Sequence, residues 1–153
     1  MLLFLLGFLA TSAEAGASHR KAGSTGIGLG GGTASAGISA KHFMSDSMAL
    51  QGVVGTYGRW NDGNGLGLSA DYLLEQPVVA SADVVDIAWN VGVGAGLGIG
   101  DGVAIGVSGV AGLEFAIVPV PFDFVIEYRP TFLLIPQPAF DLVTFSGHLR
   151  YFF

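Results

Sequence analysis

The chain has 153 residues, of which 51% are hydrophobic and only 12% are charged; its formal net charge is −6, and the absence of cysteine excludes disulfides and thiolate metal sites. Typical soluble domains carry roughly 25% charged residues, so this chain has too little charge to cover a soluble surface, and its acidic balance gives no reason to expect nucleic-acid binding. No apolar run approaches the roughly 20 residues of a membrane helix, which leaves a β-barrel or an aggregation-prone β protein.

Residues 1–10, MLLFLLGFLA, form an apolar run of the length found in signal peptides. Ala13 and Ala15 then place small residues at the −3 and −1 positions of a possible cleavage site. No Lys or Arg precedes the run, which departs from the usual pattern, and the alternative interpretation is an apolar first strand. Because the run lacks the two-residue period of a strand, we predict a signal peptide over residues 1–15 and a short polar tail over residues 16–25.

Residues 26–153 divide into alternating segments that are separated by turn residues, such as the run NDGNG at residues 61–65. The 25 glycines and the shortage of Glu, Lys and Gln argue against helices. Strands of about 9 to 13 residues can span a bilayer when they are tilted, and an even number of them suits a closed barrel. We therefore predict an all-β fold, an eight-stranded antiparallel up-and-down transmembrane β-barrel. The predicted strands cover residues 26–31, 36–44, 48–59, 66–74, 86–98, 103–117, 122–134 and 139–153, and the longest loop covers residues 75–85.

Sorting the strand residues by parity gives one face of large apolar side chains and one face of small or charged side chains. In the strand at residues 86–98, for example, Trp89 and Val91 alternate with Asn90 and Gly92. A soluble barrel would put the large apolar face inside, whereas a membrane barrel would put it outside. A surface that faces water should be rich in Lys, Glu and Arg, but the second face is rich in glycine. We therefore expect the small and charged face to line a narrow lumen.

The charged residues of this second face would lie inside the barrel. Unpaired buried charges cost several kcal/mol each, so these side chains should pair with one another. We hypothesise a salt-bridge network, built on Glu127, Arg129, Arg150, Glu114 and Lys41, that fixes the strand register and plugs the barrel. The alternative is that the charges contact trapped water. The predicted lumen charges are Lys41, Asp71, Glu114, Glu127, Arg129, His148 and Arg150.

A catalytic interpretation is available, because Ser146, His148 and Glu127 could be drawn as a triad. Ser146 and His148 lie two residues apart on one strand and would point into a packed lumen, whereas a lipid-cleaving site must open to the bilayer or the rim. The chain also lacks the Gly-x-Ser-x-Gly sequence of a nucleophile elbow. We therefore predict no enzyme activity, no catalytic residue, no cofactor and no metal site. His42 falls on the lipid side by strict alternation, as an interfacial or bulge residue.

The last predicted strand, AFDLVTFSGHLRYFF, has one polar and one apolar face and ends on an aromatic residue. This pattern resembles the C-terminal signature of Gram-negative outer-membrane β-barrels. In that family the signature is read by the barrel-insertion machinery, and the resemblance assigns this role to Phe145, Leu149, Tyr151 and Phe153. Other aromatic residues are placed as the interfacial girdles of such barrels would be, with Tyr57 and Trp60 at the end of the third predicted strand.

Three further stretches resemble a group of small bacterial outer-membrane barrels of the OmpA/OmpX-like type. They are GISAKHFMSD at residues 37–46, IGVSGVAGLE at residues 105–114 and FVIEYRPTFLLIP at residues 124–136. The resemblance implies an eight-stranded barrel in the bacterial outer membrane, and it implies no established activity.

A barrel that is filled by its own side chains conducts little, and short loops offer little surface for adhesion. We therefore expect a monomer in contact with outer-membrane lipid that has a structural or membrane-integrity role, and no nucleic-acid partner. A narrow pore for small solutes ranks second. A lipid-modifying barrel enzyme and a soluble secreted ligand-binding barrel remain as further alternatives.

Overall fold

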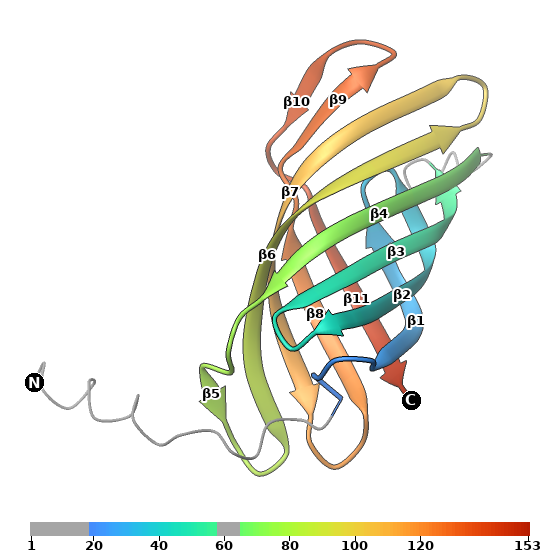
Figure 1. Ribbon diagram of the computed structural model, residues 1–153. Helices are drawn as coiled ribbons and strands as arrows, with labels where there is room; N and C mark the ends of the chain where they lie inside the picture. The colour runs from blue at the N-terminus through green and yellow to red at the C-terminus, as the bar shows by residue number, and fades with distance from the viewer. Residues whose placement is uncertain (1–18, 58–64) are drawn as a thin grey trace, which may run out of the picture.

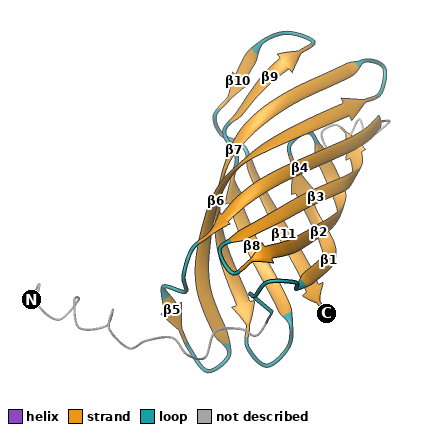
Figure 2. Ribbon diagram, in the orientation of Figure 1, coloured by secondary structure: helices purple, strands orange, loops and turns teal. Residues whose placement is uncertain are grey.

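The computed structural model describes residues 19–57 and 65–153. The predicted signal peptide and Trp60 lie outside the described residues. The described chain is built of strands joined by turns and loops (Figure 2). None of the described residues belongs to a helix that is long and apolar enough to cross a membrane.

The strands form one closed antiparallel barrel, in which β1, β2, β3, β4, β6, β7, β8 and β11 follow one another and β11 pairs again with β1 (Figure 1). The prediction of an all-β fold with an eight-stranded antiparallel barrel is confirmed. The strand bounds are β1 (Thr25–Gly32), β2 (Ser35–Ser45), β3 (Met48–Tyr57), β4 (Gly65–Glu75), β5 (Ala80–Ser81), β6 (Val85–Ile99), β7 (Val103–Ile117), β8 (Phe122–Tyr128), β9 (Thr131–Ile135), β10 (Ala139–Asp141) and β11 (Phe145–Phe152).

The last two predicted strands are each divided in two. Arg129 and Pro130 separate β8 from β9, although both halves pair with β7. Proline has no N–H to donate to a neighbouring strand, which explains the interruption at this position. Strand β10 pairs with β9, whereas β11 pairs with β8 and β1, so the hairpin of β9 and β10 extends beyond the closed barrel (Figure 1). The predicted long loop contains β5, which pairs with β6.

Most of the large apolar side chains point outward, although Phe43, Leu73 and Phe152 are buried inside the barrel. Leu29 and Val93 are 67% and 65% exposed, whereas Glu114 and Glu127 are fully buried. Since side chains alternate along a strand, the burial of one face fixes the exposure of the other. Of the two arrangements that the sequence allows, the structure therefore has the one with the small and charged face inside. His42 lies on the exposed side, next to a bulge between Phe43 and Ser45.

Glycines allow the wall to close between β1 and β11. Residues 26–30 of β1 pair with residues 148–152 of β11. A Cβ at Gly28 would overlap the carbonyl oxygen of Leu149, and a Cβ at Gly26 would lie 2.7 Å from the ring of Phe152. The two strands approach so closely that only glycine fits at these positions.

Other glycines make room for the turn between β1 and β2, which lies inside the lumen. Thr33 in this turn is buried. A Cβ at Gly96 of β6 would overlap the carbonyl oxygen of Thr33, and a Cβ at Gly67 of β4 would lie 2.6 Å from the carbonyl oxygen of Ala34. The space above these lumen glycines is therefore filled by the chain itself.

Tyr57 was expected in an interfacial girdle, but its ring points into the lumen. A Cβ at Gly98 of β6 would overlap the ring of Tyr57, which places the ring over this glycine. Residue 57 shares its parity with the buried Gln51 and Val53 of β3, so strand alternation requires an inward direction. The aromatic type of the residue misled the prediction, and its parity was the correct signal.

Gly96 and its cross-strand partner Gly106 test the role of the buried turn. Gly96→Ala should reduce the free energy of unfolding by about 1–3 kcal/mol, because its methyl group collides with Thr33. Gly106→Ala is the matched control, since its Cβ would make only contacts of 3.4 Å or longer. Urea unfolding of both variants in detergent, followed by tryptophan fluorescence, measures the difference. Equal stability of the two variants would contradict the packed turn.

Candidate functional site

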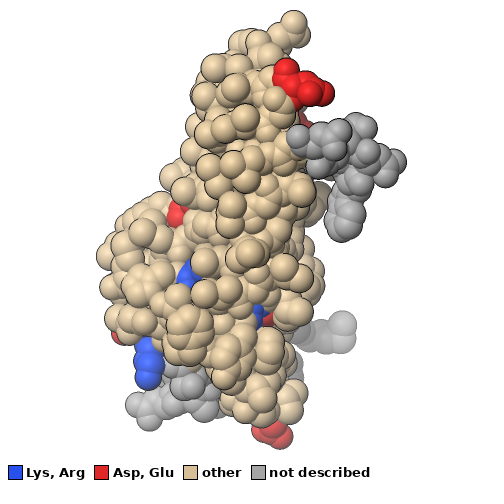
Figure 3. Space-filling view, turned by 90° about the vertical axis from the view of Figure 1, so that its right-hand side faces the viewer, with Lys and Arg blue, Asp and Glu red and all other residues tan. Residues whose placement is uncertain are grey.

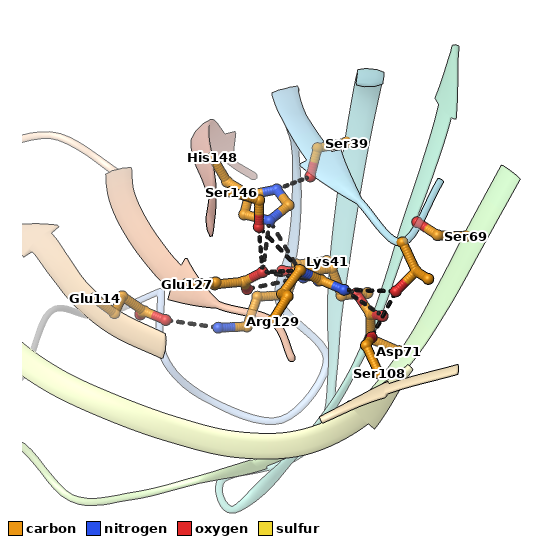
Figure 4. A network of polar contacts seen from close by, with 12 residues as sticks. Ser39, Lys41, Ser69, Asp71, Ser108, Glu114, Glu127, Arg129, Ser146 and His148 are labelled. Carbon is orange, nitrogen blue, oxygen red and sulfur yellow. Dashed lines mark hydrogen bonds and ion pairs between the residues drawn. The ribbon is translucent and has the colours of Figure 1, made fainter. Parts of the chain in front are cut away.

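The candidate site is the polar interior of the barrel. All seven predicted lumen charges point inward and are buried. Figure 4 shows six of them, all except Arg150, with side chains that extend into the lumen from strands on different sides. The seven charges form an upper group around Arg129, a central group around Arg150 and a lower group around Lys41, and the first two share a partner.

Arg129 and Glu127 form the upper group with Asp71 of β4. The guanidinium of Arg129 donates two hydrogen bonds to Asp71, one of them from Nη1 to Oδ1 at 3.0 Å. Its Nε also donates to Oε2 of Glu127 at 2.8 Å. Arg129 directly follows β8, and strands β4 and β8 are not neighbours in the barrel. This bidentate pair therefore joins two walls across the lumen.

His148 of β11 bonds to Glu127 and to a serine that the sequence analysis did not single out. Its Nε2 lies 3.0 Å from Oε2 of Glu127, and its Nδ1 lies 2.8 Å from Oγ of Ser39. Ser146 Oγ donates to the same Oε2 of Glu127 at 3.1 Å. Ser146 and His148 are thus two partners of one carboxylate, and Ser39 takes the position beside the imidazole that a triad would give to its nucleophile.

Ser39, His148 and Glu127 form a buried chain of hydrogen bonds. Ser39 has no exposed surface, and its Oγ is engaged with His148. A nucleophile needs space for the reacting atom of the substrate next to it. The packing around Ser39 therefore gives this hydrogen-bonded chain a structural part in the lumen.

The central group is built around Arg150 of β11 and includes two residues missing from the predicted set. Arg150 donates from Nη2 to Oδ2 of Asp123 at 2.8 Å and from Nη1 to Oε1 of Gln51. The Nε2 of Gln51 donates in turn to Asp71 at 3.0 Å and to Glu127 at 2.9 Å. Gln51 therefore connects the central group to the upper one.

Parity places Asp123 on the lumen face, although it was not included in the predicted set of charges, and parity would have placed Gln51 there as well. Asp123 lies on the same face of its strand as Glu127, and Gln51 lies on the inward face of β3. Gln51 carries no charge, so it was not among the predicted lumen charges. An uncharged amide is nevertheless well suited to this position, because it donates to carboxylates and accepts from a guanidinium.

The lower group joins Lys41 of β2 to two carboxylates. The Nζ of Lys41 lies 2.6 Å from Oε2 of Glu114 and 2.7 Å from Oε1 of Glu75. Arg20 pairs with the same carboxylates, with its Nε 2.7 Å from Glu114 and its Nη2 3.0 Å from Glu75. Two cations and two carboxylates thus alternate at this end of the lumen, which compensates the cost of their burial.

Arg20 and His19 come from the segment that the sequence analysis placed in a polar tail. Its described part packs against the end of the barrel, where the ring of His19 stacks on Phe152 with the ring centroids 4.7 Å apart. Burial opposes the charge on Arg20, but the carboxylates of Glu114 and Glu75 outweigh it and raise the pKa of Arg20. Parity applies only within strands, so it could not place these two residues.

The four residues of the predicted insertion signal lie on the outer face of the barrel. Phe145, Leu149, Tyr151 and Phe153 are all exposed. The rings of Tyr151 and Phe122 make an edge-on contact with centroids 5.2 Å apart, and Phe145 packs beside Tyr128. The apolar stripe of β11 therefore continues onto β8.

Comparison with protein families, with curated proteins and with solved structures finds no match to this chain. Among the described residues, no cluster of His, Cys, Asp and Glu has the arrangement of a metal site.

Glu127→Gln tests the upper group. The variant removes the negative charge that faces Arg129 and leaves a buried guanidinium with one carboxylate partner, so we expect a loss of about 3–5 kcal/mol in the free energy of unfolding. Asp101→Asn, in the exposed turn between β6 and β7, is the matched control and should change stability by less than about 0.5 kcal/mol. Both values come from urea unfolding in detergent. If Glu127→Gln were as stable as the control, the ion pairs would not hold the barrel together.

His19 should make the stability of the folded end depend on pH. Burial lowers the pKa of His19 below its ordinary value of 6.5, and its Nε2 has no hydrogen-bond partner among the described residues. The pKa of His19 is lower in the folded than in the unfolded state. The neutral ring therefore contributes to stability at pH values above 6.5, and this contribution is lost as the pH falls through the folded-state pKa.

His19→Phe keeps the stacking on Phe152 and removes the titration. Between about pH 8 and pH 5, the unfolding midpoint of the unmodified protein should fall more than that of the variant. Thermal unfolding in detergent across this range provides the measurement, and groups shared by both proteins cancel in the comparison. Parallel pH profiles would show that the pKa of His19 is the same in the folded and the unfolded protein.

Proposed function

We propose that this chain is a transmembrane β-barrel of the bacterial outer membrane with a structural or membrane-integrity role. The observation that carries the proposal is the inverted distribution of polarity. Fully buried ion pairs fill the interior, whereas the outer wall carries large apolar side chains. Such a wall suits hydrocarbon, and a closed barrel satisfies the backbone without water.

The positions of the exposed charges support a membrane-spanning band. In the described parts of the chain, each exposed charge lies outside the long barrel strands, in a turn or loop, near the first strand or on β10. On the face drawn in Figure 3, uncharged residues cover most of the surface, and the most prominent Asp and Glu atoms lie near its top and bottom. Charged side chains at the centre of a bilayer would cost about 2–4 kcal/mol each, so a band without them is expected. The exposed charged residues are Lys21, Asp46, Asp83, Asp101 and Asp141.

The filled lumen favours a structural role over transport. The turn between β1 and β2 occupies the space above Gly67 and Gly96, and Arg20 and Lys41 neutralise the carboxylates at the other end. A solute would have to displace these groups together. The same filling argues against a ligand-binding interior. The narrow pore stays the second candidate because the side chains of the lumen are polar.

The fold also supports a monomer. Each of the eight long strands of the barrel has a neighbour on both sides, so no long open edge is left for pairing with a second chain. The aromatic residues on the outer face of β11 are available for recognition by the barrel-insertion machinery, as the resemblance of the C-terminal strand implies. Outer-membrane lipid would then be the main partner of the wall.

The proposal is tested by refolding the chain in detergent and inserting it into phospholipid vesicles. A closed membrane barrel should migrate differently on a denaturing gel before and after boiling, and its strands should resist protease in vesicles. In planar bilayers the structural role predicts no resolved conductance steps. A protein that stays soluble in plain buffer would contradict the membrane assignment, and regular conductance steps would favour the narrow pore.

A further inference from the structure

The outer wall contains an apolar groove that the proposed structural role does not use. It extends from β3 across β4, β6 and β7 to β9 and β10, and it has a volume of about 680 Å³. Sites for small molecules have volumes of roughly 300–1,000 Å³ and are lined mainly by hydrophobic side chains. The groove is therefore large enough to hold a ligand along part of its length.

Small residues in adjacent strands account for the depression. Ala70 of β4 faces Ala95 of β6, and Gly109 of β7 faces Val93 of β6. All four line the groove. On a flat or convex wall such positions would carry larger side chains. The small size of Ala70, Ala95 and Gly109 lets a ligand come close to the backbone.

Aromatic residues form the two ends of the groove. At one end the rings of Phe132 and Phe140 pack together with their centroids 4.4 Å apart. At the other end Tyr72 lies beside Leu50, its cross-strand partner in β3. A linear apolar ligand could lie between these ends along the wall.

The polar atoms that border the groove are already engaged within the protein. The hydroxyl of Tyr72 donates to the sulfur of Met48 at 2.8 Å, and the hydroxyl of Thr131 donates to the carbonyl oxygen of Arg129 at 2.9 Å. Ser108 Oγ lies 2.6 Å from Oγ1 of Thr33, and the carboxylate of Asp71, the one charged lining residue, is paired with Arg129. A ligand with polar groups would find few partners here, so the chemistry of the groove selects hydrocarbon.

We propose that this groove holds one acyl chain of a membrane lipid more persistently than the rest of the outer wall does. The inference rests on the proposed function, because only a bilayer surrounds the wall with acyl chains. Within hydrocarbon the hydrophobic effect gives no preference for one apolar surface over another. Retention must come from van der Waals contacts, which a concave surface makes on several sides of the chain and a convex surface makes on one.

Gly109→Leu fills the groove without a predicted clash. A Cβ at Gly109 would meet only Cγ of Pro130, at an ordinary 3.5 Å. Gly147→Leu is the matched control, because Gly147 lies on the outward face of β11, a strand that does not line the groove, and its Cβ would lie 3.3 Å from the carbonyl oxygen of Val125. Both changes add the same side chain to the wall.

The experiment uses the full chain in vesicles of phosphatidylethanolamine and phosphatidylglycerol that contain a phospholipid with a photoactivatable diazirine in its acyl chain. Mass spectrometry of the illuminated protein should find adducts concentrated on the groove residues. Gly109→Leu should reduce these adducts severalfold, and Gly147→Leu should leave them unchanged.

The outcomes separate this inference from the proposed function. Adducts spread evenly along the outer wall, or an unchanged pattern in Gly109→Leu, would overturn the lipid site in a protein that has nevertheless inserted. Failure of the unmodified chain to insert, seen as loss of protease resistance and of heat-dependent gel mobility, would instead overturn the membrane assignment.

Discussion

The buried pairing of charges is the constraint on which the rest of the structure depends. A carboxylate or guanidinium inside a closed barrel loses its water, and it is tolerated only where partners replace that water at good geometry. Glu127 receives hydrogen bonds from Arg129, Ser146 and Gln51, and Arg129 also reaches Asp71 on the far wall. These contacts fix which strands face each other, because a shift of one residue in any strand would turn its charges toward the outer wall.

Close approach of the backbone is the second condition, and it explains the glycine content. The three groups of charges occupy part of the lumen, while the turn between β1 and β2 occupies another part and rests against Gly67 and Gly96. Glycine at these positions gives up side-chain packing, and the buried turn restores it. The lumen is thus filled by ion pairs from the strands, by backbone from the first hairpin and by a cluster of buried apolar side chains that includes Phe43, Leu73 and Phe152.

The inverted distribution of polarity links this interior to the proposed role. A barrel with its ion pairs inside and its apolar side chains outside gains little by remaining in water and is suited to a bilayer. The hairpin of β9 and β10 departs from the barrel at Pro130, and the same region contributes one end of the apolar groove. Irregularity in the wall and the candidate lipid site therefore have a common origin in the interruption between β8 and β9.

The sequence by itself determined the number of long strands, their direction and the face that each residue occupies, because alternation is a local property with a period of two. For the same reason, all seven predicted charges were assigned to the lumen from parity alone. Only the tertiary structure decided which charge meets which. Arg129 pairs with Asp71 across the lumen, Arg150 pairs with Asp123, and Arg20 enters from outside the strands to complete the lower group. Closure and shear of the barrel bring these residues together, and neither is a property of any single strand.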